Sequence, residues 1–247
     1  MQAIRRITEK FPKREIPPFP CPKCGLHLVA REKEPQLDQS SESEFHCDNE
    51  GDPSMYEGVF TLRLVCSSSD CEESVNCAGL FTTSQIEGKY GEPTYRTYLA
   101  VKFFIPTVHL FPLSSAIPEK VKEPLVDSFS TFWANPSAAG NSLRISVEAL
   151  MDYRGVKKWY RDKKGKERAY DLHARIEMFR PSAPHLGDKI LAVKWLGNSG
   201  SHLAGLKRED VIKAYEMYSY VLEELFEKRT ETLTKMARKI NRRRGPA

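Results

Sequence analysis

The segment K-W-L-G-N-S-G-S-H, at residues 194–202, is the most informative stretch of the chain. It closes a short amphipathic segment at 188–196 and precedes a strongly periodic helical segment. Its two glycines indicate a tight corner, and a simple connector rarely needs a Trp, an Asn and a His together. The pattern therefore predicts a polar site, containing Asn198 and His202, between two helices.

Helical patterns precede this corner. We expect a helix at 119–133, whose first turn Pro124 can separate from the rest. A second helix is expected from Pro136 to about Arg154, with Asn135 as its cap. The apolar residues of this second helix recur at helical spacing, as Leu143, Val147 and Leu150.

The clearest helical pattern lies after the corner. It begins near Lys207 and is expected to run to about Arg242. Its apolar residues recur every three or four positions, as Val211, Tyr215, Tyr218, Leu222 and Leu225. A shorter helix is expected at 170–179, and the proline-containing segment 106–118 is expected to form an extended linker along the surface.

The corner resembles part of an uncharacterised helical family of bacterial restriction and phage-defence proteins, often found behind a zinc ribbon. The resemblance extends to N-S-L-R-I-S-V-E-A-L-M-D at 141–152 and L-K-R-E-D-V-I-K-A-Y-E-M-Y at 206–218, and covers roughly residues 115–228. The family is similar to the HEPN superfamily, many of whose members are RNases that carry an Arg, a polar residue and a His. Asn198 and His202 match that pattern, whereas Gly197 stands at the position of the Arg.

The candidate site contains His202 and Asn198, which the resemblance implies, together with Arg144 and Glu148 from the preceding helix. In an RNase of this type the His activates the ribose 2′-hydroxyl and a cation stabilises the charged phosphorane. Arg144 is the candidate replacement for the missing Arg if its helix packs on the corner, and Glu148 lies four residues later on the same face. The alternative is structural, with the Asn as a helix cap and the His bonded to a backbone carbonyl.

All six cysteines lie within residues 21–77. In a cytosolic protein such clustering favours metal binding over disulfides. The motif C-P-K-C-G at 21–25 is one zinc knuckle, and Cys66 with Cys71 forms the second. The sequence therefore predicts a structural Zn²⁺ site with four thiolate ligands, Cys21, Cys24, Cys66 and Cys71.

Three possible ligands, His46, Cys47 and Cys77, remain outside this site, and their spacing does not favour a second metal site. We expect Cys77 to pack in a strand at 74–82, and keep Cys47 as the substitute ligand if the pairing differs. The insertion at 26–65 carries the acidic stretch L-D-Q-S-S-E-S-E and is expected to form a mobile loop or an elongated hairpin.

Strands are expected to dominate this half of the chain. Segment 58–65 alternates, with Val59, Thr61, Arg63 and Val65 on one face and Phe60, Leu62 and Leu64 on the other. Segment 95–105 is rich in β-branched and aromatic residues, which also predicts a strand. A turn is expected at 87–93.

The charge of the chain is unevenly distributed. The formal net charge is +5, yet residues 38–57 contain seven acidic residues and no Lys or Arg. Segment 228–244 contains eight basic residues and one acidic residue, which suits nucleic-acid binding, although a solvated helix end has the same composition. The predicted nucleic-acid-binding residues are Lys235, Arg238, Lys239, Arg242, Arg243 and Arg244.

A basic insertion, K-K-W-Y-R-D-K-K-G-K-E-R at 157–168, holds Trp159 and Tyr160. Basic residues interleaved with aromatic residues suit nucleic-acid contact. They equally suit an exposed loop whose two aromatic side chains pack into the core.

Together these observations predict an α+β protein, with a small zinc-ribbon β unit at 1–113 and an α-helical HEPN-like bundle at 114–247. We expect a zinc-containing nucleic-acid-binding or sensing protein of a bacterial antiviral or restriction-type defence system, which forms homodimers and binds RNA or DNA. The alternatives are a metal-independent RNase or toxin that uses His202, and an adaptor that binds a defence-system partner protein. A cytoplasmic location is expected, because residues 1–14 do not resemble a signal peptide and the longest apolar stretch, 99–113, is too short to span a membrane.

Overall fold

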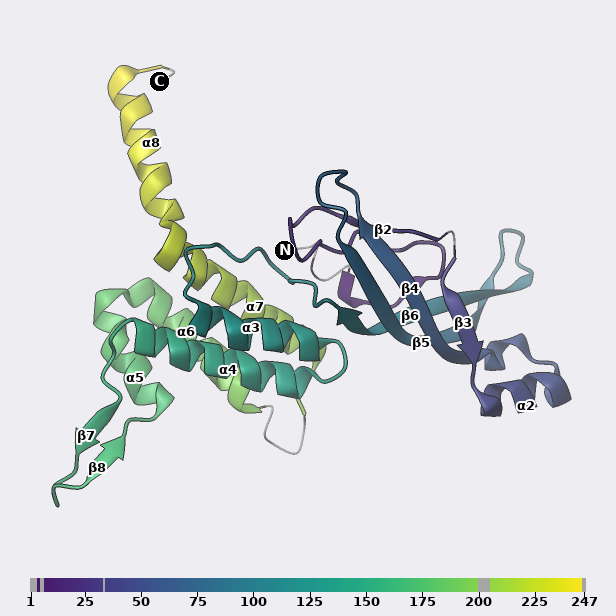
Figure 1. Ribbon diagram of the computed structural model, residues 1–247, viewed down its shortest axis with the longest axis horizontal. Coiled ribbons are helices and arrows are strands. Elements are labelled where there is room, and N and C mark those ends of the chain that lie inside the picture. Colours follow the sequence, from purple (N-terminus) through teal and green to yellow (C-terminus); the bar gives the residue numbers. More distant parts are fainter. Residues whose placement is uncertain (1–3, 5–6, 33, 200–204, 246–247) are drawn as a thin grey trace. The chain divides into compact units, whose positions relative to one another are not determined.

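The computed structural model describes residue 4 and residues 7–32, 34–199 and 205–245 (Figure 1). It confirms the α+β class, since an antiparallel sheet precedes a group of helices. The chain divides into two compact units. The sheet unit contains Met1–Leu110 and Phe129–Asn135, and the helical unit contains Phe111–Ser128 and Pro136–Ala247.

The sheet unit is built on three long strands and three short ones. The long strands are β4 (Glu57–Cys66), β5 (Ser74–Glu87) and β6 (Pro93–Ile105), and the short ones are β1 (Phe11–Pro12), β2 (Leu28–Ala30) and β3 (Gln36–Gln39). All pairings are antiparallel, in the order β1-β6-β5-β4-β2, and β3 also pairs with β4. The predicted strands at 58–65 and 95–105 and the turn between β5 and β6 are confirmed.

The alternation along β4 separates the two faces of the sheet. Phe60, Leu62 and Leu64 are buried, whereas Val59, Thr61 and Arg63 are exposed, as the period of two requires. Cys77 lies on β5, opposite Leu62 of β4, and its side chain is buried. The prediction that Cys77 packs in a strand is therefore confirmed. Edge-to-face contacts among Phe19, Phe104 and Trp133 fill one part of this core.

The insertion 26–65 pairs β2 and β3 antiparallel with β4, as the elongated-hairpin alternative predicts, whereas the mobile loop is wrong. The acidic stretch begins in β3 and continues into a helix that was not predicted, α2 (Ser41–Glu50). Ser40 caps its N-terminus by accepting the Ser43 amide hydrogen, and Gly51 ends the helix in the left-handed conformation. The buried Ser43 hydroxyl donates to the Met55 carbonyl at 2.6 Å and accepts from the Glu57 amide at 3.0 Å. These bonds connect α2 to the short 3₁₀ helix η1 (Pro53–Met55) and to β4.

The helical unit contains most of the predicted helices. They are α3 (Glu119–Phe132, with its last turn in the sheet unit), α4 (Pro136–Tyr153), α5 (Leu172–Phe179), α6 (Pro184–Ser199), α7 (Arg208–Leu222) and α8 (Arg229–Arg243). The 3₁₀ helix η2 (Arg180–Ser182) precedes α6. Pro124 lies inside α3, so the expected separate first turn is wrong. Proline has no backbone N–H, so Pro124 removes one hydrogen bond from α3. The loss is tolerated because it lies close to the N-terminus of the helix, where the first amides have no partner within the helix in any case.

Two serine–tyrosine pairs hydrogen-bond α3 and α4 to α7. The Ser128 hydroxyl donates to the Ala139 carbonyl and is 2.7 Å from the Tyr215 hydroxyl, which therefore acts as the donor. The Ser146 hydroxyl lies 2.9 Å from that of Tyr218. All four hydroxyl-bearing residues are buried, and burial raises the pKa of both tyrosines. The bundle core is thus partly polar but hydrogen-bonded.

The proline-containing segment 106–118 contains no helix or strand, in agreement with the expected linker. Pro106 and Pro112 are exposed, whereas the apolar side chains of Val108, Leu110, Phe111 and Ile117 are buried. Burying these side chains stabilises the path of the segment.

The expected single C-terminal helix is interrupted, so that prediction is wrong. After α7 the chain forms a π-helical turn, η3 (Glu223–Glu227), and Lys228 then takes the left-handed conformation with φ of 51°. The Lys228 amide donates to the Glu223 carbonyl at 3.1 Å, and α8 starts at the next residue. No helix in the described part of the chain has the length and apolar character of a membrane span.

Candidate metal centre and basic surfaces

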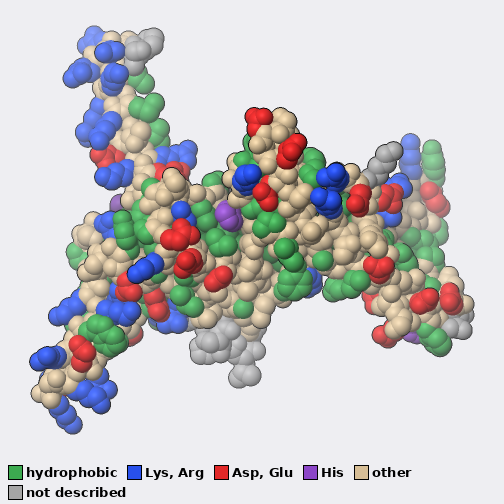
Figure 2. All heavy atoms as spheres, in the orientation of Figure 1, with side chains coloured by type: hydrophobic (Ala, Val, Ile, Leu, Met, Phe, Trp, Pro, Cys, Tyr) green, Lys and Arg blue, Asp and Glu red, His purple; other side chains and the backbone are tan. Residues whose placement is uncertain are grey.

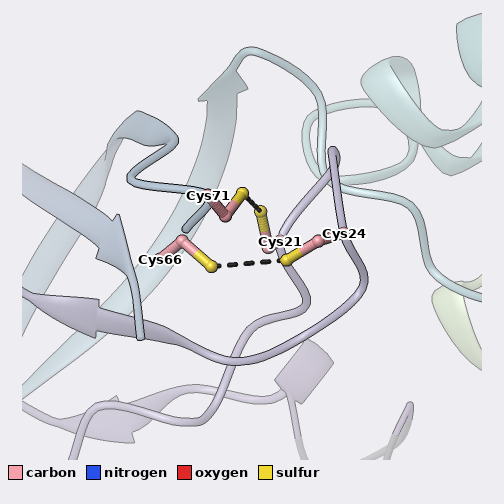
Figure 3. A group of neighbouring side chains, drawn as sticks. All are labelled: Cys21, Cys24, Cys66 and Cys71. Atoms are coloured by element: carbon pink, nitrogen blue, oxygen red, sulfur yellow. Dashed lines mark hydrogen bonds between the residues drawn. The ribbon is translucent and has the colours of Figure 1, made fainter. Parts of the chain in front are cut away.

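The four predicted cysteine ligands lie together at one end of the sheet (Figure 3). Cys21 and Cys24 occupy the turn before β2, Cys66 ends β4, and Cys71 lies in the turn between β4 and β5. The pairing of Leu28 with Cys66 joins the two turns, because it aligns the start of β2 with the end of β4. The sheet register therefore assembles the cluster.

The sulfur positions fit a tetrahedral ion. The Sγ atoms of Cys21 and Cys71 are 3.8 Å apart, those of Cys24 and Cys66 are 3.4 Å apart, and all four lie within 4.8 Å of one another. Four sulfurs at about 2.3 Å from one zinc ion would be about 3.8 Å apart. The distances are much longer than a disulfide bond of about 2.05 Å. The cluster is therefore compatible with a metal site and contains no disulfide.

Backbone amides point at the sulfurs in both turns. Gly25, with φ of 76°, allows the first turn to close, and its amide donates to the Cys21 carbonyl. The Leu26 amide bonds Cys24 and, with help from the neighbouring thiols, lowers the pKa of Cys24 to about 7. The Ser68 amide donates to Cys66 Sγ at 3.4 Å. Such N–H donors stabilise thiolates, which are the form that binds metal.

The thiols of Cys66 and Cys71 hold their protons more tightly, because their pKa values are raised. The Ser68 amide lowers the pKa of Cys66, but burial and the neighbouring thiols outweigh it and raise that pKa to about 12. The Glu73 amide lowers the pKa of Cys71, but burial and the thiols of Cys24 and Cys21 outweigh it and raise that pKa. A bound cation would replace these protons, so metal binding at this cluster should release protons.

The remaining predicted ligands lie apart from this cluster. Cys77 is buried in β5, where burial raises the pKa of its thiol to about 12. Cys47 lies on α2 with its sulfur 3.8 Å from the Asp52 carbonyl, and His46 is the residue before it. Among the described residues, Cys21, Cys24, Cys66 and Cys71 form the one group with metal-ligand spacing.

The predicted corner at 194–202 is partly a helix. α6 continues through Gly197 to Ser199, so the expected helix end before Gly197 is wrong. Gly197 does not end the helix but allows α6 to pack closely on α4. A Cβ at this position would lie 2.8 Å from the Gly140 carbonyl oxygen on α4. The Asn198 side chain and His202 lie outside the residues that the structure describes.

Arg144 and Glu148 form the predicted pair on α4, with Nη2 and Oε1 2.9 Å apart. The Cβ of Arg144 is 3.1 Å from the position that a Cβ on Gly197 would take, so α4 does pack against this part of α6. The Arg144 Nε is buried and has no hydrogen-bond acceptor in the described part of the chain. The packing condition under which Arg144 is named as the replacement Arg is therefore met at Gly197. The roles of Arg144 and Glu148 stay predictions, and His202 lies outside the described residues.

The predicted nucleic-acid-binding residues lie on or next to α8, which is exposed along its whole length (Figure 2). Apolar Leu233, Met236 and Ile240 recur at helical spacing and are all about half exposed. Lys235, Arg238 and Arg242 follow the opposite side of the helix by the same spacing. Among the residues predicted to bind nucleic acid, Lys235 forms an ion pair, in which its Nζ lies 2.5 Å from Glu231 Oε1.

The basic insertion forms a hairpin, β7 (Trp159–Arg161) paired with β8 (Glu167–Ala169), here called the basic ribbon (residues 157–170). Trp159 is half exposed, and Tyr160 packs on Tyr170 with ring centroids 4.6 Å apart. The alternative in which both aromatic side chains pack into the core is therefore wrong. The hairpin was not predicted, although Asp162 and Gly165 between two short segments with aromatic and basic residues are typical of a hairpin turn.

Comparisons with known proteins give two family matches. Residues 127–243 match a family described as "Domain of unknown function (DUF4145)", and residues 9–107 match one described as "Domain of unknown function (DUF8608)". The first match spans α4 to α8, and the second spans the six-stranded sheet and its four cysteines. No curated protein and no solved structure matches the chain.

Proposed function

We propose that this chain is a zinc-containing nucleic-acid-binding protein and that α8 supplies the main contact with the phosphate backbone. The observation that carries the proposal is the exposed basic face of α8. Helix α8 itself contains six basic residues and one acidic residue, and Arg244 follows it. A surface of this kind neutralises phosphates and releases their counterions.

The metal in this proposal is Zn²⁺, held by Cys21, Cys24, Cys66 and Cys71. Four thiolates at tetrahedral spacing are typical of structural zinc sites, because they leave no position open for a substrate or water. The zinc would therefore stabilise the end of the sheet and take no part in chemistry.

The proposed biological setting rests on the sequence resemblance. The segments at 141–152 and 206–218 resemble HEPN-like proteins of bacterial restriction and phage-defence systems. We therefore place the protein in an antiviral or restriction-type defence system, as a cytoplasmic homodimer that binds RNA or DNA and acts with a partner protein.

The experiment measures binding of zinc-loaded protein to labelled RNA, single-stranded DNA and duplex DNA. One variant neutralises α8 by the changes Arg238→Gln, Lys239→Gln and Arg242→Gln. A matched control removes the same charge from exposed residues of the sheet unit by Lys10→Gln, Lys89→Gln and Arg96→Gln. Removing three phosphate contacts should weaken binding by about tenfold or more at moderate salt, whereas the control should stay within about twofold.

Two results would overturn the proposal. One is the absence of nucleic-acid binding by folded, zinc-loaded protein at physiological salt, which would favour the adaptor function. The other is equal weakening by the α8 variant and by the control, which would show that net charge alone drives association.

A second candidate function is a metal-independent RNase that uses His202. The observation that favours it is the position of Arg144 beside Gly197, with a buried Nε that has no acceptor in the described part of the chain. The test is RNA cleavage in EDTA by wild type and His202→Ala, with folding checked in the same buffer. Cleavage by wild type alone would support this candidate, and no cleavage by folded protein would exclude it.

A further inference from the structure

We infer that the basic ribbon is a docking element for single-stranded nucleic acid, on which an unpaired base stacks against Trp159. The inference rests on the proposed nucleic-acid function but concerns a different element from α8. The ribbon belongs to the helical unit and is formed entirely by described residues.

The indole of Trp159 is available to a ligand. Half of its surface is exposed, although burying a tryptophan is strongly favourable. Its cross-strand partner is Ala169, whose methyl group is too small to cover the ring. Within the described part of the chain no aromatic ring or cation packs on Trp159, whereas Tyr160 on the other face packs against Tyr170.

The ribbon is held in place before any ligand binds. Asp162 closes the turn, since its Oδ1 accepts the amides of Lys164 at 2.9 Å and Lys166 at 3.0 Å. Its Oδ2 accepts from Arg168 Nε at 3.2 Å, and the Tyr170 amide donates to the Lys158 carbonyl at 2.9 Å. A rigid aromatic platform binds with a smaller loss of conformational entropy than a mobile one.

The base of the ribbon is tied to the bundle through Asp152 on α4. This carboxylate accepts from the buried Arg175 on α5 at 2.5 Å and from Lys158 at 3.3 Å. Arg175 also donates to the Val156 carbonyl at 3.1 Å, just before the ribbon. These contacts fix where the ribbon leaves the helical unit.

The ribbon is positively charged, which is complementary to the negative charge of a phosphate chain (Figure 2). Residues 157–168 contain seven basic and two acidic residues. Lys158 and Arg168 are paired with Asp152 and Asp162. The other basic residues of the ribbon are exposed and form no ion pair within the described ranges. These residues are Lys157, Arg161, Lys163, Lys164 and Lys166.

The arrangement favours a single strand over a duplex. Trp159 and Arg161 are two residues apart and so lie on the same face of β7. An unpaired base can stack on the Trp159 ring while the phosphate next to it contacts the Arg161 guanidinium. In a duplex the bases are already stacked on each other, so Trp159 would add little to binding.

The test compares Trp159→Ala and Trp159→Phe in the full-length, zinc-loaded protein. The probes are a labelled 12-nucleotide oligothymidine and a labelled duplex DNA of the same length. Trp159→Ala should weaken single-strand binding by about fivefold to a hundredfold and leave duplex binding within about twofold. Trp159→Phe should retain most of the affinity. The matched control is Tyr90→Ala, which removes an aromatic side chain that is 86% exposed in the β5–β6 turn and should change nothing.

The outcomes separate this inference from the proposed function. If the α8 variant weakens binding but Trp159→Ala does not, the ribbon inference is overturned and the proposed function stands. If Trp159→Ala weakens single-strand and duplex binding equally, the ribbon is not a single-strand element. If wild type binds neither nucleic acid, both fail. Selective loss with Trp159→Ala and retention with Trp159→Phe would support the inference.

Discussion

The sheet unit and the helical unit hold their cores together in different ways. In the sheet unit, four thiols converge from two turns at one end of the sheet, with sulfurs within 4.8 Å of one another. In the helical unit, buried hydroxyl pairs and a close contact of two glycines join α3, α4, α6 and α7. If the proposed metal site is correct, the sheet unit depends on an ion that the chain must acquire, while the helical unit depends on contacts that the chain supplies itself.

The largest expected effect is loss of the metal from the sheet unit. Cys24→Ser removes one of four ligands, and structural zinc contributes about 10 kcal/mol or more to folding in small zinc domains. We expect the metal content to fall and hydrogen exchange to accelerate in β2 and β4, while α4 and α7 stay protected. Metal analysis and hydrogen–deuterium exchange measure both effects.

Cys47→Ser is the control for this change, because Cys47 lies outside the cluster. It should keep the full metal content. Retention of metal by Cys24→Ser, or equal loss of protection in both units, would contradict the comparison.

The next effect breaks the helix contact in the helical unit. In Gly197→Ala the new Cβ would lie 2.8 Å from a backbone oxygen of Gly140, which cannot move aside without shifting α4. Overpacking of this kind costs about 1–3 kcal/mol, which exceeds the gain in helix propensity of about 1 kcal/mol. The free energy of unfolding from urea titration should therefore fall.

Gly140→Ala provides the matched comparison at the same contact. The nearest atom to its new Cβ is the flexible Leu206 Cδ2 at 3.0 Å, which can move. Its effect on the free energy of unfolding should be smaller than that of Gly197→Ala. The reverse order would show that the glycine contact is not the tight point of this packing.

A smaller effect should follow from Tyr215→Phe. The change removes the hydroxyl that donates to Ser128, while Ser128 keeps its bond to the Ala139 carbonyl. A buried hydrogen bond contributes about 1 kcal/mol, so the free energy of unfolding should fall by about that amount. Tyr220→Phe is the control, since the Tyr220 ring contacts Lys189 and its hydroxyl forms no hydrogen bond with the described residues. Equal stability of the two variants would contradict the proposed role of the serine–tyrosine pairs.

The smallest effect concerns the turn of the basic ribbon. The Lys166 amide, followed by the Lys164 amide and Arg168, lowers the pKa of Asp162 from its usual value. Because the folded-state pKa is depressed, the order that Asp162 gives the turn is present above the unfolded-state pKa of about 3.9 and is lost as pH falls through the lower folded-state pKa. The amide NMR signals of Lys164 and Lys166 should therefore shift with pH in that acidic range, and Asp162→Asn should abolish the shift. A shift that persists in Asp162→Asn would assign it to another group.

Much of the fold could be predicted because local patterns agree with the tertiary structure. The alternation at 58–65 predicts which face of β4 is buried, and the spacing of Leu143, Val147 and Leu150 predicts the buried face of α4. The cysteine cluster follows from the spacing of two knuckles alone.

The errors occur where non-local or capping contacts decide the structure. Gly197 continues α6 because its missing side chain admits Gly140 from another helix, which no local pattern records. The acidic helix α2 depends on bonds from Ser40 and Ser43, and these outweigh the polar composition that predicted a loop. The break at Lys228 occurs without glycine or proline, so composition gave no signal for it.

The most direct test of the central claim is the salt dependence of nucleic-acid binding. The measurement is the slope of log K against log salt concentration for the oligothymidine probe, with wild type, the α8 triple variant and the sheet-unit control. We expect log K to fall steeply and linearly with log salt concentration for wild type and for the control. For the α8 variant the slope should be shallower by about 2, since each of the three removed contacts with a single strand contributes about 0.7. Salt-independent binding, or a slope that the α8 variant leaves unchanged, would contradict the claim that α8 contacts the phosphates.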